Sequence, residues 1–300
     1  MSDRPVLAGA LGALVIAFSA ILVKLAEVSP STAAFFRCFY ALPLLALLAW
    51  REHDRYGGRS RRDHLLGWIA GVLFAANLIF WHHAIEAVGA GLSTVLGNVQ
   101  VVFVALLAWA ALGERPNNRS LVAVPVVFSG VVLISGVIGS GAYGDDPQLG
   151  VAFGLANAVM YALFLLILRN INADIRRPAG PLFDATLSAA LFAALGGLAV
   201  GDIDFLPGLE SQLWLLLLAL SSQVLGWMLI STSLPRLPAL LTSILLMLQP
   251  VGTMLLGMLI FSESPSALQL AGVVVVLAGV GFAATAPAQL TSRSRPVSTS

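Results

Sequence analysis

The stretch ALGERPNNRSLVAVPVVFSGVVLI at residues 111–134 has a second copy, IFSESPSALQLAGVVVVLAGVGF, at residues 260–282. Both lie within an ungapped match of residues 92–134 with 241–283, at an offset of 149 positions. Apolar identities carry little weight in so apolar a chain, but polar residues, proline and glycine also recur in register. These pairs are Gln100/Gln249, Glu114/Glu263, Pro116/Pro265 and Gly130/Gly279. The match predicts that the chain consists of two related halves.

The composition predicts an integral membrane protein. Hydrophobic residues make up 58% of the 300 residues and charged residues only 10%, whereas soluble proteins have about 25% charged residues. A formal net charge of +1 gives no basic face for phosphates, which argues against nucleic acid as a partner. The one cysteine, Cys38, lies in an apolar run, so neither a disulfide framework nor a thiolate metal site is expected.

Ten stretches of the chain are long and apolar enough to cross a bilayer as helices. Such a helix needs about 20 mostly apolar residues, and the alternating pattern of a membrane barrel is missing from the sequence. The predicted spans are 5–25, 31–50, 65–86, 91–112, 119–138, 148–168, 180–201, 211–232, 238–261 and 265–286. We therefore predict an all-α integral membrane protein with ten transmembrane helices.

The charged residues predict the orientation of these helices. Fourteen of the 16 Lys and Arg residues lie in the connections of one side, among them the arginines of the loop 51–62. The opposite connections carry acidic residues instead, which are Glu27, Asp145, Asp146, Asp202, Asp204 and Glu210. Because basic loops stay in the cytoplasm, we expect both termini there.

The repeat divides the predicted helices into two groups of five. We expect a first half at residues 1–143, a second half at 144–287 and a disordered cytoplasmic tail at 288–300. Five is an odd number, so the second half enters the membrane from the opposite side. Inverted repeats of this kind allow alternating access to a site near the middle of the bilayer.

Several motifs resemble the drug/metabolite transporter superfamily, EamA-type. They are Lys24 at the end of the first span, AFFRCFYALPLL at 34–45, HHAIEAVGAGLSTVL at 82–96 and the two copies quoted above. The resemblance implies ten helices in two repeats and is greatest to bacterial inner-membrane exporters of amino acids, including the aromatic-amino-acid type. The proline common in the fourth span is Val101 here, while its counterpart Pro250 is present. We expect Pro250 to act as a hinge.

Polar and aromatic side chains near the middle of the predicted spans are candidates for a substrate site. The pairs Asn77/Trp81, Asn157/Tyr161 and Gln223/Trp227 are spaced i,i+4 and so share a helix face. In the fourth span Gln100 is preferred over the stripe of Thr94 and Asn98, because its counterpart Gln249 shares a stripe with Thr242 and Thr253. This set suits a zwitterionic or amphipathic small molecule. The alternative is that these amides only join helices, at about 1 kcal/mol each.

Three ionisable residues near the outer ends of the spans, Arg37, Lys24 and His83, need a role. Arg37, about 10 Å deep, either binds a substrate carboxylate or closes the outer end of the bundle by capping carbonyls or pairing with Glu86 or Glu27. The second role is favoured, because the family carries this arginine with unrelated substrates. Lys24 is expected either to extend its ammonium group to the membrane interface or to pair with Glu27 or Glu86. His83 is a candidate for proton coupling, since imidazole titrates near neutral pH.

These features predict a secondary exporter of small metabolites, most specifically aromatic or other neutral amino acids. The sequence contains no P-loop, HExxH or GxSxG motif, which argues against an ATPase or an enzyme. A channel and an exporter of other metabolites or drugs remain open alternatives. No cofactor and no metal are expected. The sequence decides neither the exact substrate, nor the driving ion, nor between a monomer and a dimer.

Overall fold

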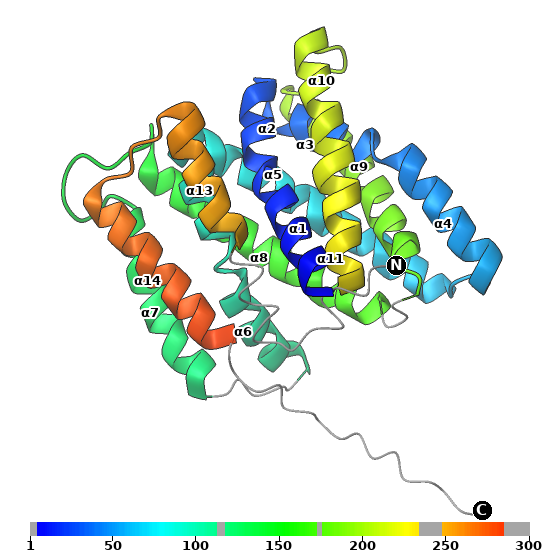
Figure 1. The fold of residues 1–300 in the computed structure, drawn as a ribbon, viewed down its shortest axis with the longest axis horizontal. Coiled ribbons are helices and arrows are strands. Elements are labelled where there is room, and N and C mark those ends of the chain that lie inside the picture. Colours follow the sequence, from blue (N-terminus) through cyan, green and yellow to red (C-terminus); the bar gives the residue numbers. More distant parts are fainter. Residues whose placement is uncertain (1–4, 113–117, 173–175, 234–247, 285–300) are drawn as a thin grey trace, which may run out of the picture.

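The computed structural model describes residues 5–112, 118–172, 176–233 and 248–284, and all regular secondary structure within these ranges is helical (Figure 1). The expected tail 288–300 and Glu114 lie outside the described residues. The helices are α1 Pro5–Ala17, α2 Ser19–Ala26, α3 Pro30–Phe39, α4 Leu42–Tyr56, α5 Arg61–Gly97, α6 Gln100–Leu112, α7 Asn118–Ile134, α8 Pro147–Ile171, α9 Ala179–Val200, α10 Leu209–Leu218, the π-helix η1 Ala219–Gly226, α11 Trp227–Ser233, α13 Leu248–Phe261 and α14 Ala267–Ala284.

Much of this helical structure is long and apolar enough to cross a membrane. Six described stretches qualify by length and composition, and three shorter apolar helices of 10–17 residues accompany them. The shorter ones are Leu121–Ile134, Leu248–Phe261 and Ala267–Phe282. The all-helical, multi-pass class agrees with the sequence. The number of ten spans and the cytoplasmic location of the termini stay predictions.

Helix α5 contains a chain reversal at Gly89. This residue has a φ of +83° inside the 37 residues of α5, a conformation that favours glycine. Asn77 donates a hydrogen bond to Asn157, and a Cβ on Gly97 would lie 2.8 Å from the same Asn157 side chain. In a straight helix Asn77 and Gly97 would be about 30 Å apart. The chain therefore doubles back at Gly89, and α5 comprises two antiparallel helical segments.

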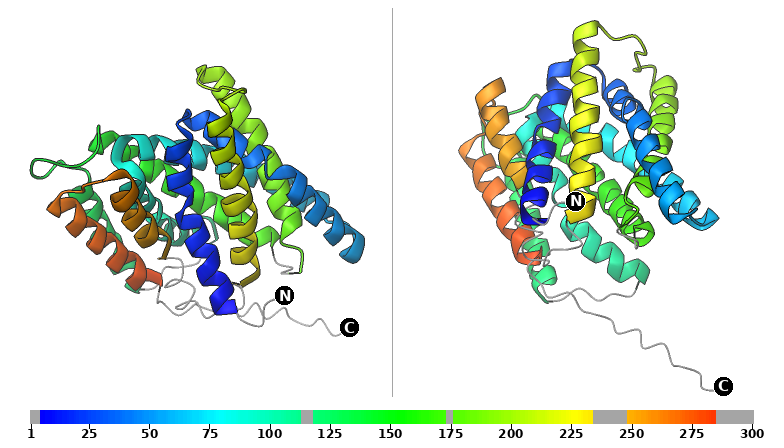
Figure 2. Two further views of the ribbon diagram at one scale, coloured as in Figure 1. Left: turned by 45° about the horizontal axis from the view of Figure 1, so that its top comes forward. Right: turned by 45° about the vertical axis from the view of Figure 1, so that its right-hand side comes forward.

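The repeated segments form equivalent helices that pack against each other. Shifting α7, Asn118–Ile134, by the repeat offset gives residues 267–283, which match α14, Ala267–Ala284. A Cβ on Gly130 would meet the backbone of Gly272 at 2.8 Å, and one on Gly279 would meet Val127 at 2.7 Å. The contacts ascend in one helix and descend in the other, so α7 and α14 run antiparallel, side by side at one edge of the bundle (Figures 1 and 2).

Helix starts follow local capping rules. Ser60 and Asp63 form a reciprocal capping box at the start of α5, and Asp146 accepts the N–H of Leu149 before Pro147 opens α8. Each interaction supplies an acceptor for an N–H that has no partner in the first helical turn. The polar connections therefore fix where the helices begin.

Close packing of α5 on α9 depends on Gly71, and we expect Gly71→Ala to destabilise the protein by about 2 kcal/mol through overpacking. A Cβ at this position would lie 2.4 Å from the backbone oxygen of Ala185. Gly196→Ala on α9 is the matched control, because the nearest atom there is 3.9 Å away. Thermal unfolding in detergent measures both. Equal unfolding temperatures for the two variants would contradict the assignment of Gly71 to a tight contact.

Candidate functional site

A cavity of about 80 Å³ lies among the helices, lined by polar and aromatic side chains from both halves of the chain. The helices α1–α3, α5, α8, α11 and α13 contribute to it. The lining residues are Ile16, Ser19, Arg37, Phe74, Asn77, Leu78, Trp81, Thr94, Gly97, Asn98, Asn157, Tyr161, Trp227 and Gln249. Six of the eight residues expected to bind substrate are among them. The role of each in binding stays a prediction.

Among the described residues, Arg37 is the only charged side chain in the wall of this cavity. Its residue is 3% exposed. Its Nε donates to Oε1 of Gln223 at 3.0 Å and its Nη1 donates to Oγ of Ser19 at 2.9 Å. None of the ion pairs among the described residues includes Arg37. The expectation that Arg37 pairs with Glu27 or Glu86 is therefore wrong, because neutral hydrogen-bond acceptors surround the guanidinium.

Aromatic rings and an amide pair complete the wall. The Arg37 guanidinium lies 5.9 Å from the ring centre of Trp81, within the range of a cation–π contact. Trp227 meets Tyr161 edge to face, with the ring centres 6.3 Å apart. The side chain of Asn77 donates a hydrogen bond to the side chain of Asn157. Both asparagines are buried. The aromatic rings make most of the cavity wall apolar, and the asparagines and Arg37 place polar groups at fixed positions in it.

Gln100 does not line the cavity, contrary to the sequence prediction. The helical segment before it ends at Gly97, and α6 starts at Gln100 after a turn at residues 98 and 99. The helical stripe assumed for a straight fourth span does not continue across this break. Thr94 and Asn98 face the cavity instead. The Gly97–Asn98 pair is the signal that could have located the break, since glycine and asparagine commonly end helices.

Gln223 is also absent from the cavity wall, although its expected pair Trp227 lines it. Gln223 is fully buried, accepts the hydrogen bond from Arg37 and donates to Oγ1 of Thr186 at 3.0 Å. It lies in the π-helix η1, where hydrogen bonds join residues i and i+5. The i,i+4 rule used for the pair therefore fails here. Gln223 positions Arg37 rather than contacting the cavity.

At one end of the bundle, Glu263 closes a contact between distant segments. Its Oε1 lies 3.0 Å from Nζ of Lys24 and accepts the N–H of Ala90 at 2.7 Å. Its Oε2 accepts the N–H of Gly91 at 3.1 Å. The carboxylate thus joins α2 to the helical segment that follows the reversal at Gly89. We call this the Glu263 latch.

The partner of Lys24 differs from the sequence prediction. Glu27 follows the last residue of α2 with a φ of +48°, so the local helix does not bring it to Lys24. Glu86 lies 3.2 Å from Nδ1 of His83 and is exposed. Glu263 takes the pairing role expected of Glu27 or Glu86. The sequence position of Glu263, 239 residues away, gives no local indication of this contact.

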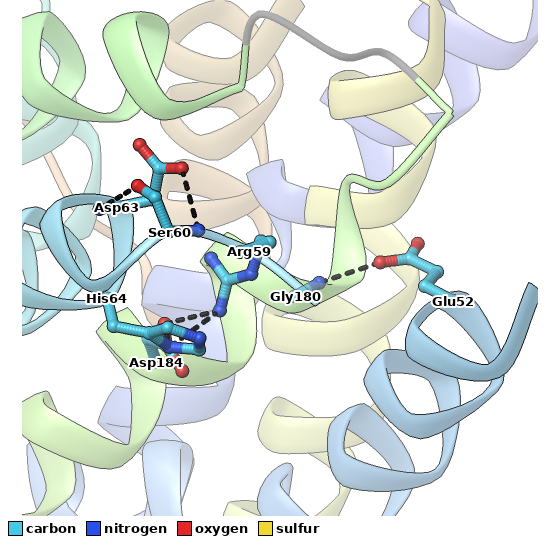
Figure 3. A network of polar contacts seen from close by, with 7 residues as sticks. All are labelled: Glu52, Arg59, Ser60, Asp63, His64, Gly180 and Asp184. Atoms are coloured by element: carbon cyan, nitrogen blue, oxygen red, sulfur yellow. Dashed lines mark hydrogen bonds and ion pairs between the residues drawn. The ribbon is translucent and has the colours of Figure 1, made fainter. Parts of the chain in front are cut away.

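The opposite end of the bundle carries a second network, shown in Figure 3. Arg59 of the loop before α5 donates to Oδ2 of Asp184 on α9, and Nδ1 of His64 lies 2.8 Å from the same oxygen. Both oxygens of Glu52 accept backbone N–H groups at the start of α9, from Ala179 at 2.9 Å and from Gly180 at 2.8 Å. We call the contact of Arg59 and His64 with Asp184 the Asp184 latch.

A cavity between two closing contacts, the Glu263 latch and the Asp184 latch, suggests a protein that moves a solute through the membrane. Comparison with known proteins supports this class of protein. The sequence model of the EamA-like transporter family matches residues 4–136 and again residues 148–285. The chain belongs to the EamA-like transporter family. An uncharacterized transporter of Archaeoglobus fulgidus is 25% identical over 289 residues, covering 93% of this chain and 97% of the relative. A protein crystal structure with 16% identity has a TM-score of 0.63 over 95% of this chain and 99% of that chain, and this likeness concerns the fold alone.

Membership in the EamA-like family, part of the drug/metabolite transporter superfamily, identifies the chain as a multi-pass membrane transporter of small molecules. Lys24 and Arg59 lie in the first matched range of this EamA-like transporter, whereas Glu263 and Asp184 lie in the second. Both latches therefore connect one repeat to the other. The cavity also takes residues from both matched ranges.

The remaining predicted residues of the EamA-like transporter lie away from the cavity. His83 stacks on Phe153 with the ring centres 4.9 Å apart. Pro250 is buried in the first described turn of α13, and residues 234–247 before it lie outside the described part. The roles of His83 in proton coupling and of Pro250 as a hinge stay predictions. Within the described residues, no cluster of three His, Cys, Asp or Glu side chains is arranged to hold a metal ion.

Beside the Glu263 latch, the EamA-like transporter has a wide depression of about 790 Å³. Lys24, Glu27, Glu86 and Asp145 contribute charged groups to it. Tyr143 also lines it, and partial burial with the carboxylates of Glu263 and Asp145 raises the pKa of this phenol above its ordinary value. The phenol therefore stays neutral at physiological pH. The depression lies next to the Glu263 latch.

Proposed function

We propose that the protein is a secondary transporter that exports small metabolites with a carboxylate, specifically aromatic or other neutral amino acids, across the bacterial inner membrane. The observation that carries the proposal is Arg37, a buried guanidinium in the cavity wall without a carboxylate partner among the described residues. A charge inside a membrane protein is costly and normally pairs or serves function. A substrate carboxylate supplies the missing partner.

The wall around Arg37 fits the rest of such a substrate. The rings of Trp81, Trp227 and Tyr161 offer apolar surface for a side chain and π-faces for an ammonium group. The buried amides of Asn77 and Asn157 supply donors and acceptors at fixed positions. A carboxylate on Arg37 with an ammonium over an aromatic ring accounts for both charges of a zwitterion. This arrangement favours amino acids over purely cationic compounds.

Alternating access explains why the cavity is small and why each end has a latch. A site for a drug-sized ligand has about 300–1,000 Å³, whereas this cavity has about 80 Å³. The helices must move apart before an amino acid can enter. Release of the Glu263 latch or of the Asp184 latch separates the two repeats at one end while the other end stays closed. This corresponds to the rocking of inverted repeats about a central site.

Transport by the purified protein in liposomes tests the proposal. We expect saturable uptake of radiolabelled phenylalanine and counterflow when unlabelled phenylalanine is preloaded. A channel would support neither saturation at modest concentrations nor counterflow, and an enzyme would change the compound chemically. Absence of counterflow for a panel of neutral amino acids, from protein that is folded by thermal unfolding, would contradict the proposed substrate class.

Trp81→Ala is expected to reduce phenylalanine counterflow about two- to tenfold while expression stays normal, because it removes an aromatic face worth about 0.5–1.5 kcal/mol. The matched control is Trp68→Ala on the same helix, since Trp68 is exposed and does not line the cavity. Counterflow kinetics of both variants give the comparison. If Trp81→Ala retains the wild-type rate, Trp81 is not part of the substrate site.

A further inference from the structure

A second pocket of about 280 Å³ lies beside the Asp184 latch, between α4 and α9. It is separate from the central cavity and shares no lining residue with it. The residues that line it are Ala46, Ala49, Trp50, Glu52, His53, Gly57, Arg59, His64, Arg177, Gly180, Phe183 and Asp184. In the proposed transport cycle the contact of Arg59 with Asp184 holds one end of the bundle closed, but the pocket beside it has no role in that cycle.

The pocket contains the guanidinium groups of Arg59 and Arg177 and the carboxylates of Glu52 and Asp184, and both carboxylates are hydrogen-bonded within the protein. Both carboxylate oxygens of Glu52 accept backbone N–H groups, and Oδ2 of Asp184 is bonded by Arg59 and His64. Nη1 of Arg59 is buried with no hydrogen-bond acceptor in the described part of the chain. A buried guanidinium nitrogen without an acceptor is unfavourable. Figure 3 shows Arg59 between the start of α9 and Asp184.

The surroundings of the pocket favour an anionic ligand. Arg177, which also lines the pocket, donates from Nη1 to the backbone oxygen of Gly57 at 3.0 Å. The rim belongs to residues 51–62, which comprise the end of α4, a short loop and the start of α5, and the exposed arginines of this region outside the pocket are Arg51, Arg55, Arg61 and Arg62. These charges raise the local concentration of anions. A phosphate group fits the planar donors of Arg59.

The apolar wall of the pocket favours a lipid over a free phosphate ion, because only a lipid has an acyl chain to contact it. Ala46, Ala49 and Trp50 form the α4 side of the pocket. Leu44, Leu47 and Trp50 follow at every third position, lie on one side of α4, and are 39%, 41% and 65% exposed. Tryptophan is typical of the level of lipid headgroups. An apolar track therefore leads from the pocket along α4 for about 9 Å.

We propose that this pocket binds the phosphate headgroup of an anionic glycerophospholipid, with the phosphate on Arg59 and an acyl chain along Leu47 and Leu44. Basic pockets between transmembrane helices are a known type of site for such headgroups. The proposal depends on the membrane location of the protein and not on the identity of its substrate. When the Arg59 side chain turns toward the pocket, a bound lipid would supply the acceptor that the buried Nη1 lacks, next to the contact of Arg59 with Asp184.

Thermal unfolding of the full-length protein in detergent, with and without added phosphatidylglycerol, tests the site. We expect phosphatidylglycerol to raise the unfolding temperature of the wild type more than phosphatidylcholine with the same acyl chains. Arg59→Gln is expected to weaken phosphatidylglycerol binding about tenfold or more, since it removes a charge-assisted hydrogen bond. Arg55→Gln removes the same charge from the adjacent last turn of α4, outside the pocket, and should keep the wild-type response.

Ala49→Phe is the second variant, because it fills the pocket and leaves every charge in place. We expect it to lose the phosphatidylglycerol response while its unfolding temperature without lipid stays close to that of the wild type. Wild-type responses from both Arg59→Gln and Ala49→Phe would overturn the site. An equal effect of inorganic phosphate or glycerol phosphate on the wild type would overturn the lipid assignment, since the acyl track would then contribute nothing.

Discussion

Arg37→Gln is expected to lower the kcat/KM of phenylalanine counterflow about 100-fold while the free energy of unfolding stays equal or rises. Loss of charge-assisted hydrogen bonds to a substrate carboxylate costs about 3 kcal/mol, which corresponds to about 100-fold. The variant loses the hydrogen bonds to Gln223 and Ser19, but it also removes a buried charge that no ion pair of the described residues compensates. Counterflow kinetics and thermal unfolding of the same preparation separate the two effects.

Gln223→Glu is a second variant, and it distinguishes a role of Arg37 in substrate binding from a role in joining helices. It places a carboxylate where the amide oxygen now accepts the Nε–H of Arg37 at 3.0 Å. If Arg37 binds substrate, the new carboxylate competes with it, so transport falls while the protein becomes more stable. If Arg37 only joins helices, the new ion pair strengthens that role and transport persists. Arg37→Lys is expected to recover little activity, because an ammonium group lacks the planar pair of donors.

The sequence predicts the helical architecture well, because apolar runs, short connections and the repeat offset are all local or periodic features. The match of α7 with α14 follows directly from that offset. The cavity is predicted in part. Asn77, Trp81 and Asn157, which helical spacing assigns to a common site, line the cavity and lie in regular helices, and their role in substrate binding stays a prediction.

The failures occur where the backbone departs from a regular helix or where the partners are far apart in sequence. Gln100 follows a break after Gly97, and Gln223 lies in a π-helix, so the period of 3.6 residues does not apply to either. Lys24 is paired with Glu263 rather than with a local acid. Such a contact depends on how helices pack, which hydrophobic spacing does not specify.

Glu263→Ala is expected to lower the free energy of unfolding by about 3–5 kcal/mol. The side chain of Glu263 is 2% exposed. Its removal leaves the buried N–H groups of Ala90 and Gly91 without an acceptor, and each such group costs about 1–3 kcal/mol. Lys24→Met should cost less than Glu263→Ala, because the Lys24 side chain is 31% exposed and the carboxylate keeps both of its backbone N–H donors.

The exchange variant Lys24→Glu with Glu263→Lys separates the ion pair from the backbone cap. It retains opposite charges at the two positions, but an ammonium group at 263 offers no acceptor to Ala90 and Gly91. The side chain at 263 is also closely surrounded. A Cβ on Gly89 would lie 2.7 Å from Oε1 of Glu263, and a Cβ on Gly257 would lie 2.4 Å from Oε2. The longer lysine side chain therefore has little room. We therefore expect the exchange to remain as unstable as Glu263→Ala in chemical unfolding. Recovery of wild-type stability would show that the charge pair, and not the capping of the segment after Gly89, holds this end of the transporter closed.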